Sequence, residues 1–538
     1  MDARPMVDFA LLQAAEQLGP RLGSFTKQSQ AMPRTNAVEI ATPGLITMTS
    51  RGVVPHLSRD HTRGSEAIQW VHVPFESFLE HTPPLPTLQP GPNPLHTFLG
   101  FPPERHIVSL ALRDPHDARE MPPNTAEYVT ARCVRGVRRV TPAQWRSYAS
   151  TCAPDIVLAL PDVPFTPPPH SQKRQEKSVA RTAQWAALML DPGVSKMNVL
   201  VQMAGGASLA ARRAFADSLR EELYDREAAA IAPHKRIDDG LLGYTFDLEP
   251  LRLSVAATTE KYAITRAPDA PAAPIQAASA LRPDLAPLLS ASLDRLSARK
   301  LRIAHSSVSP HETLRLIQRV GIDLFDAHWA QRAADVGVAL DFTFPSPRSG
   351  RRRAIGHNLY DEAYAHDFST LSTDVPPPVD SQAESSGCPC VACAPRVPTT
   401  RLTHSTIDKP APNAGSRLPS YSRAYLHHLL HTHEMGAHTL LVAHNLAILD
   451  AFFAGVRRVL RRGAGEGGGD HDVLDSEAFA KEVDRFEEEY DGDLAIIEEA
   501  RARWLEVDRA RGKGRLAREK VKQEQATLGT AVALTPEA

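Results

Sequence analysis

The chain has 538 residues, of which 42% are hydrophobic and 23% charged, and its formal net charge is −2. These values are typical of globular proteins, and they exclude both a wholly disordered chain and a uniformly basic nucleic-acid coat. The excess of 45 prolines over 30 glycines predicts extended surface insertions around a smaller core. Because no apolar run is long enough to cross a membrane and no secretion signal is recognisable, we expect a cytoplasmic protein.

From residue 155 onward, short apolar runs alternate with stretches of helical spacing. We expect strands at 155–160, 198–203, 240–246, 301–305 and 321–326, and helices at 177–190, 208–222 and 309–320. Strand–helix–strand units of this length require parallel pairing. The pattern therefore predicts a (β/α) barrel or an open doubly wound sheet, and the chain is long enough for a barrel with insertions.

Two aspartates end predicted parallel strands. Asp162 follows the apolar run DIVLAL, and Asp326 ends the run GIDLFD. In a barrel, catalytic groups gather at the carboxyl-terminal ends of the strands. The alternative is a loop aspartate that caps the following helix. Both residues are therefore pocket candidates.

The C-terminal region has a different composition. Residues 470–508 are rich in acidic side chains, residues 509–522 are basic, and apolar residues recur at helical spacing over 476–507. This pattern predicts one or two surface helices with a charged tail.

Three of the five cysteines, Cys388, Cys390 and Cys393, fall within six residues. A sparse, odd and clustered set does not indicate a disulfide framework, whereas thiolates at this spacing suit zinc. Structural zinc needs a fourth ligand, and a histidine-rich segment lies downstream. Spacing alone does not choose among its members, which are His427, His428, His431, His433, His438 and His444.

Basic clusters occur at 173–181, 348–353 and 457–462. Each has enough positive charge to neutralise phosphates, although such clusters are more often ordinary solvated surface. Within the second cluster, the candidates for RNA binding are Arg348, Arg351, Arg352 and Arg353.

The cysteine motif, followed by YSRAYLHHLL at 421–430, Glu434 and the pair His444-Asn445, resembles the C-terminal signature of tRNA-guanine transglycosylases. The run RVGIDLFD at 319–326 resembles the strand that carries the nucleophile of this family. The resemblance extends over about residues 155–460. It implies a TIM-like (β/α)8 barrel with an inserted zinc-binding subdomain and a helical C-terminal tail. It also implies one Zn²⁺ per chain, with His444 as the fourth ligand.

The resemblance is weaker at the positions that match the catalytic and base-recognising residues of the family. Catalytic members use an aspartate nucleophile, which Asp326 matches, and a second aspartate in a D-S-G-G-F-Q motif as acid and base. That motif is missing, and the stretch that resembles its surroundings is PHLSRDH at 55–61. Asp162 matches the aspartate that recognises the base, but the neighbouring V-Q-G-G is replaced by QMAGG at 202–206.

These losses resemble the non-catalytic partner in the eukaryotic members of the family. The resemblance then implies a heterodimer with a catalytic subunit that exchanges guanine for queuine at position 34 of tRNAs with GUN anticodons. In that case the candidates for the dimer interface are Tyr421, Arg423, Tyr425 and His428. It also implies possible peripheral association with the mitochondrial outer membrane. The alternatives are an active transglycosylase with Asp326 as nucleophile, or a zinc-stabilised scaffold.

We expect the chain to divide into three parts. Residues 1–375 form the barrel with a divergent N-terminal part and proline-rich insertions. Residues 376–463 form the zinc-binding subdomain and the last barrel helices. Residues 464–538 form an acidic and then basic helical tail.

Overall fold

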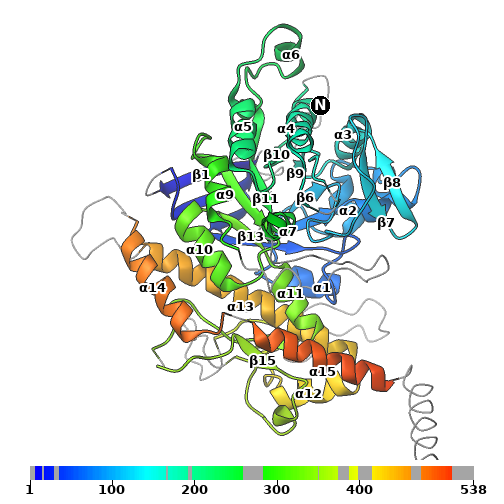
Figure 1. The fold of residues 1–538 in the computed structure, drawn as a ribbon. Helices are drawn as coiled ribbons and strands as arrows, with labels where there is room; N and C mark the ends of the chain where they lie inside the picture. The colour runs from blue at the N-terminus through cyan, green and yellow to red at the C-terminus, as the bar shows by residue number, and fades with distance from the viewer. Residues whose placement is uncertain are drawn as a thin grey trace, which may run out of the picture. The chain divides into compact units, whose positions relative to one another are not determined.

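The computed structural model describes residues 7–14, 17–28, 36–164, 166, 168–191, 197–258, 283–348, 350–372, 387–397, 415–461, 474–492 and 494–511. The chain divides into two compact units. The first comprises Met1–Gln331, Phe342–Arg353 and Leu446–Gly492. The second comprises Arg332–Asp341, Ala354–Asn445 and Asp493–Ala538. Figure 1 shows the elements of both.

The first unit contains a closed barrel of parallel strands (Figure 1). In barrel order its strands are β4 (Gly44–Met48), β5 (Trp70–Pro74), β6 (Ile107–Ala111), β9 (Ile156–Leu158), β10 (Val199–Gln202), β11 (Leu241–Asp247), β12 (Leu301–His305) and β13 (Leu324–Asp326). The pairing of β13 with β4 closes the sheet. The barrel is therefore confirmed over the open sheet. All five expected strands belong to it, because their apolar runs are buried on both faces.

Helices connect the strands. They are α1 (Arg59–Gly64), α2 (Pro94–Leu99), α3 (Pro142–Cys152), α4 (Gln172–Met189), α5 (Leu209–Arg220), α6 (Asp225–Ala230), α7 (Leu248–Thr258), α9 (Ala286–Leu293), α10 (Pro310–Val320) and α11 (His328–Asp335). The start of α4 is earlier than expected, because the Ser171 hydroxyl accepts a hydrogen bond from the Arg174 amide and caps the helix there. Ser309 caps α10 in the same way, as its sequence predicts.

An antiparallel sheet precedes the barrel in the chain. It consists of β1 (Val7–Ala14), β2 (Arg21–Gln28) and β3 (Asn36–Thr42). Phe25 packs against Trp70, and Arg21 forms a buried ion pair with Asp323, the residue before β13. Lys27 forms another with Asp155, the residue before β9. The sheet therefore covers the amino-terminal end of the barrel. The loops that follow the strands lie at the opposite end.

Shorter elements complete the first unit. They are the hairpin of β7 (Val129–Cys133) and β8 (Gly136–Val140), the 3-10 turns η1 (Glu76–Glu80), η2 (Leu85–Leu88) and η3 (Asp238–Gly240), and helix α14 (Ser476–Glu489). The apolar face of α14 is buried, and its Phe479 and Phe486 contact the ring of Phe344. The expected charged surface helix is thus amphipathic, and its aromatic stripe belongs to the core.

The second unit contains a small sheet and helices. Its elements are β14 (Val338–Leu340), β15 (Gly356–Asn358), η4 (Glu362–Tyr364), α12 (Arg423–His431), the first part of α13 (Met435–Arg461) and α15 (Ala495–Arg511). Within the described residues, α13 alone is long and apolar enough to cross a membrane, and 72% of its most apolar window is buried. Burial of this extent is what a core helix of a globular protein shows.

Candidate functional site: a metal centre and a closed barrel mouth

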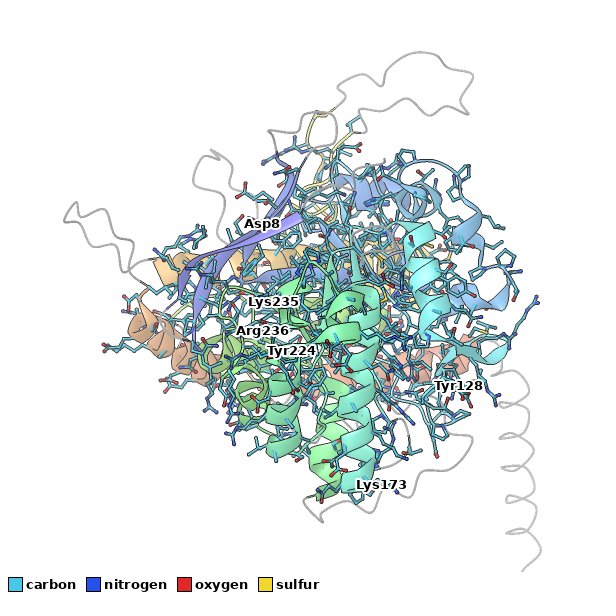
Figure 2. The ribbon with its side chains drawn as sticks, turned by 90° about the horizontal axis from the view of Figure 1, so that it is seen from above. Asp8, Tyr128, Lys173, Tyr224, Lys235 and Arg236 are labelled. Carbon is cyan, nitrogen blue, oxygen red and sulfur yellow. The ribbon has the colours of Figure 1, made fainter. Side chains whose placement is uncertain are left out.

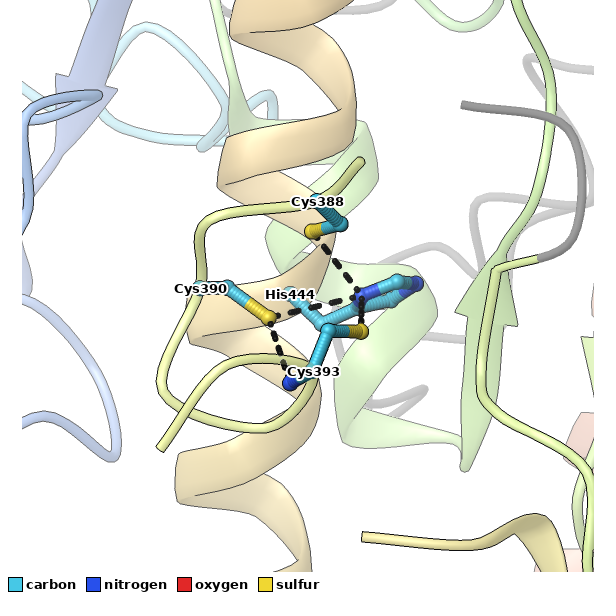
Figure 3. A group of neighbouring side chains, drawn as sticks. All are labelled: Cys388, Cys390, Cys393 and His444. Atoms are coloured by element: carbon cyan, nitrogen blue, oxygen red, sulfur yellow. Dashed lines mark hydrogen bonds between the residues drawn. The ribbon is translucent and has the colours of Figure 1, made fainter. Parts of the chain in front are cut away.

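Cys388, Cys390, Cys393 and His444 converge in the second unit (Figure 3). Their ligand atoms lie within 4.8 Å of one another, and all four side chains are buried. The Nδ1 atom of His444 is 3.6 Å from the sulfurs of Cys388 and Cys390 and 3.4 Å from that of Cys393. A tetrahedral zinc with Zn–S of about 2.3 Å and Zn–N of about 2.05 Å would hold sulfur and nitrogen about 3.6 Å apart. The donor set and its geometry therefore fit Zn²⁺.

The histidine ligand is oriented by a neighbouring strand. Its Nε2 atom donates to the carbonyl oxygen of Leu340 at 2.8 Å, which leaves Nδ1 as the nitrogen that would bind a metal. Asn445 accepts from the Leu340 amide at 2.9 Å and donates to the Val338 carbonyl at 3.0 Å. The His-Asn pair thus connects α13 to β14 through hydrogen bonds. Asn445 therefore has a structural role beside His444.

Three other histidines of the segment have partners elsewhere. His427 bonds to the Leu359 carbonyl at 2.9 Å, His431 to the Tyr360 carbonyl at 3.3 Å, and His438 to the Ala334 carbonyl at 3.1 Å. Among the candidates that spacing left open, the structure therefore brings His444 to the cysteines.

At the mouth of the barrel, Asp326 ends β13 and is completely buried. Its Oδ2 atom accepts hydrogen bonds from His116 Nε2, at 3.0 Å, and from the Ser306 amide. Its Oδ1 atom accepts from the His328 amide at 3.2 Å. The ring of His328 also stacks on that of His116, with 3.5 Å between the ring centroids. Both carboxylate oxygens are therefore occupied within the chain.

The imidazole of His116 lies between two carboxylates. Its Nδ1 atom is 3.0 Å from Asp114, and its Nε2 atom faces Asp326. Burial alone would lower the pKa of His116, but the two carboxylates raise it to about 10. Burial alone would likewise raise the pKa of Asp326, but His116 and His305 hold it well below its usual value. The pair is accordingly an imidazolium and a carboxylate at neutral pH.

Sequence reasoning did not single out Asp114 or His116. The stretch 55–61, compared above with the acid/base motif, follows β4, and its Asp60 is exposed in the first turn of α1. The residues that do reach Asp326 come from the loop after β6, where the chain reads Arg-Asp-Pro-His-Asp at 113–117. The sequence signal that could have identified Asp114 and His116 is a group of charged residues directly after a buried strand.

The other expected aspartate is also engaged. Asp162 is buried, and its carboxylate accepts hydrogen bonds from Arg174 at 2.7 and 2.9 Å, from Arg181 at 3.1 Å and from the Asn124 side chain at 3.0 Å. Two arginines of the basic cluster 173–181 therefore form ion pairs with Asp162. Both oxygens of the Asp162 carboxylate therefore already contact an arginine, and neither is left free for a ligand.

A cavity of about 130 Å³ opens beside the ends of β10 and β11, and Gln202, Gly205 and Asp247 contribute to its lining. Gly205 has a φ of +115°, and a Cβ there would lie 2.6 Å from the backbone nitrogen of Arg212. Burial raises the pKa of Asp247 to about 6. This volume is small beside the roughly 300–1,000 Å³ of typical small-molecule sites.

The proposed interface residues differ in exposure. On α12, Tyr425 is 44% exposed and its ring stacks on that of Tyr421 at 5.4 Å, and His428 is exposed as well. Arg423 is buried and bonds to Asp367 at 3.2 Å. Of the four residues, Arg423 therefore faces inward.

The expected RNA-binding arginines also differ. Arg348, Arg351 and Arg352 are exposed, and Arg352 lies 3.6 Å from Asp491. The guanidinium of Arg353 lies over the ring of Tyr490 at 5.5 Å. Part of this cluster is thus engaged within the first unit.

Comparisons with known proteins agree with the fold and the site. The sequence model of a family described as queuine tRNA-ribosyltransferase matches residues 18–232 and 260–466. The chain is 24% identical to queuine tRNA-ribosyltransferase accessory subunit 2 of Schizosaccharomyces pombe, over 89% of this chain and 84% of the relative. It is 26% identical to the protein of the same name from Drosophila grimshawi (78% and 82%) and 25% identical to that from Xenopus tropicalis (83% and 94%). The chain therefore belongs to the queuine tRNA-ribosyltransferase family, as a relative of its accessory subunits.

Proposed function

We propose that this chain is the non-catalytic subunit of a heterodimeric queuine tRNA-ribosyltransferase. In this role it binds a catalytic subunit and orients tRNA, and the pair exchanges guanine for queuine at position 34 of tRNAs with GUN anticodons. The names of the relatives support an accessory role. The heterodimer, the tRNA contact and the exchange reaction are the content of the proposal.

The contact between His116 and Asp326 carries the proposal. A carboxylate that attacks the ribose C1′ must present a free oxygen to that carbon. Asp326 is instead completely buried, and its Oδ2 atom lies 3.0 Å from the Nε2 atom of His116. Attack would require His116 and its stacked neighbour His328 to leave. The barrel thus keeps the carboxylate and uses it to hold its own loop.

The aspartate that matches the family's base-recognising residue supports the same conclusion. A carboxylate reads a guanine-like base by accepting hydrogen bonds from its ring and amino nitrogens. Asp162 already accepts from Arg174, Arg181 and Asn124. The groups that would attack the sugar and read the base are therefore both satisfied within the chain.

In this proposal the metal would have a structural role and no catalytic one. Cys388, Cys390, Cys393 and His444 fill all four positions of a tetrahedral site, as in structural zinc centres, whereas catalytic zinc keeps a position open. Bound there, the ion would supply folding free energy by joining the cysteine loop to α13. The loop and α13 lie before and after α12 in the chain, so the ion would also fix the position of that helix.

Exposed apolar side chains in the second unit support a protein partner. Met435 is 81% exposed, Phe368 79%, Leu418 46% and Tyr425 44%. Large apolar and aromatic groups at the surface are typical of interfaces, where tyrosines often dominate the binding energy. We assign the face that includes Tyr421, Tyr425 and His428 to the catalytic subunit.

Co-expression with a catalytic paralogue tests the proposal. The two chains should co-elute from a sizing column as one complex, and the complex should exchange labelled guanine into tRNA. Failure of the chains to associate at micromolar concentration would contradict the heterodimer. A complex whose activity did not depend on this chain would contradict the accessory role.

A further inference from the structure

The β7–β8 hairpin carries four arginines in eight residues. They are Arg132, Arg135, Arg138 and Arg139, and no acidic residue lies between Val129 and Val140. The hairpin is part of the connection between β6 and α3, which also contains Asp114 and His116. Connections that follow a barrel strand lie at the carboxyl-terminal end of the barrel. The hairpin therefore stands beside the mouth that Asp326 closes.

The strand register places Arg132 and Arg139 on one face of the hairpin and Arg138 on the other. Val129 pairs with Val140 and Ala131 with Arg138, and both valines and Ala131 are buried. On the opposite face, Thr130, which is also buried, pairs with Arg139, and Arg132 pairs with Val137. Residues diagonal across an antiparallel pair lie about 7–8 Å apart. Arg132 and Arg139 thus project from one face as neighbours, with Arg135 at the turn.

The guanidinium groups of this hairpin have no carboxylate partner within the described part of the chain. Among the residues that the structure describes, no ion pair includes any of its four arginines, whereas Arg174 and Arg181 are paired with Asp162. Arg132 donates to the carbonyl oxygen of Glu120, and its buried Nε atom has no hydrogen-bond partner. Carbonyl contacts orient a guanidinium without neutralising it, so the hairpin presents net positive charge.

An aromatic ring extends the basic face. The guanidinium of Arg139 lies over the half-buried ring of Tyr128, 4.8 Å from its centroid. Tyr128 lies at the edge of the molecule in Figure 2. Stacked tyrosine and arginine planes are the surfaces on which proteins place unpaired bases of single-stranded RNA.

We infer that the β7–β8 hairpin binds the sugar-phosphate backbone of tRNA beside the barrel mouth, with Tyr128 and Arg139 under a neighbouring base. The inference rests on the proposed function, because it names the surface with which the accessory subunit holds tRNA. Phosphate contacts need guanidinium groups along a path and no intact active site. An acidic protein surface would also attract the arginines, but it would not need the stacked tyrosine.

The test compares two sets of arginines in the complete heterodimer. One variant carries Arg135→Gln, Arg138→Gln and Arg139→Gln. The matched control carries Arg220→Gln, Arg226→Gln and Arg236→Gln, which are exposed and precede β11 at the other end of the barrel. Figure 2 shows Arg236 well separated from Tyr128. Both variants lose the same charge. A difference in tRNA affinity between them therefore shows that the position of the arginines matters.

The affinity for a tRNA transcript is measured against salt concentration. We expect the hairpin variant to bind at least about tenfold more weakly than wild type at 0.1 M salt, with the slope of log K against log salt smaller by about 2–3. The control should bind like wild type. A variant with Arg135→Lys, Arg138→Lys and Arg139→Lys should keep most of the affinity, because it keeps the charge.

The outcomes separate this inference from the proposed function. If the wild-type heterodimer binds tRNA no better than the catalytic subunit alone, the proposed function fails. If wild type binds tightly and the hairpin variant binds equally well, only the hairpin assignment fails. If the variant keeps tRNA but no longer co-elutes with the catalytic subunit, the hairpin is a protein-docking surface, and the inference is overturned.

Discussion

The Nε2 atom of His116 lies 3.0 Å from the buried carboxylate of Asp326, although 210 residues separate the two in the chain. This contact joins the loop after β6 to the end of β13, across the mouth of the barrel. In the proposed function, it places His116 where an active transglycosylase would need open access to its nucleophile. The barrel keeps the family's shape and closes the site with its own side chains.

If Asp326 is structural, Asp326→Asn should leave exchange by the assembled heterodimer within a few-fold of wild type. The variant should lose stability, because a buried imidazolium would face an amide. The exchange rate of the pair checks this, with complex formation confirmed for each sample. A loss of roughly 10³-fold or more in an intact complex would show that the carboxylate takes part in the chemistry.

The same contact predicts a dependence of stability on pH. The pKa of His116 is raised to about 10 in the folded chain, from roughly 6.5 when unfolded. Its stabilisation is therefore fully present below about pH 6.5 and is lost as pH rises through 10, with a total on the order of 3–5 kcal/mol. The melting temperature should fall more between pH 7 and 10 for wild type than for His116→Asn. Equal slopes would argue against the charged pair.

Removal of one thiolate tests the metal centre. Cys390→Ser should abolish stoichiometric zinc, because the remaining three ligands no longer close the tetrahedron. Cys133→Ser is the matched control, since Cys133 is also a buried free cysteine but lies outside the cluster. Zinc per chain is measured by elemental analysis of purified protein. One zinc per chain in Cys390→Ser would refute the ligand assignment.

The residue beside the histidine ligand should matter as well. Asn445→Ala would leave the Leu340 amide and the Val338 carbonyl without their side-chain partner. We expect a stability loss of about 1–3 kcal/mol and zinc bound about 10–100-fold more weakly, with stoichiometry unchanged at saturating metal. Competition with a metal chelator measures the affinity. Unaltered affinity would mean that Asn445 does not position His444.

Tyr425→Ala tests the partner surface on α12. An exposed aromatic anchor at an interface is worth about 2 kcal/mol or more, so the affinity for the catalytic subunit should fall at least about 30-fold. Tyr224→Ala is the control, because Tyr224 is 69% exposed in the other unit. Affinity is measured by titration of one labelled subunit with the other. Equal affinities for the two variants would place the interface elsewhere.

Sequence reasoning found the parts of the fold whose signals are local. The strands from 156 to 326 were predicted because each is a short, mainly apolar run, and several stand beside a stretch of helical spacing. The first three barrel strands were not predicted; WVHVP at 70–74 contains a histidine and a proline, whereas GLITM at 44–48 and IVSLA at 107–111 are as apolar as the strands that were predicted. The N-terminal sheet was missed because its buried Arg21 and Lys27 look exposed until their partners Asp323 and Asp155 are known.

The same distinction holds for the site. The cysteine spacing predicted three members of the buried cluster, and the resemblance added His444 through its His-Asn pair. The closure of Asp326 by His116 was not predictable, because it depends on which loop the barrel brings over β13. The hairpin arginines, which form no ion pair among the described residues, and the paired Arg174 and Arg181 look alike in sequence, and only their neighbours distinguish them.

The most direct test of the accessory role is the exchange of labelled guanine into tRNA by this chain purified alone. The closed carboxylate predicts no exchange above background, and activity only when a catalytic subunit is added. Turnover by the chain alone that disappears in Asp326→Asn would contradict the account, because it would show that Asp326 is a working nucleophile.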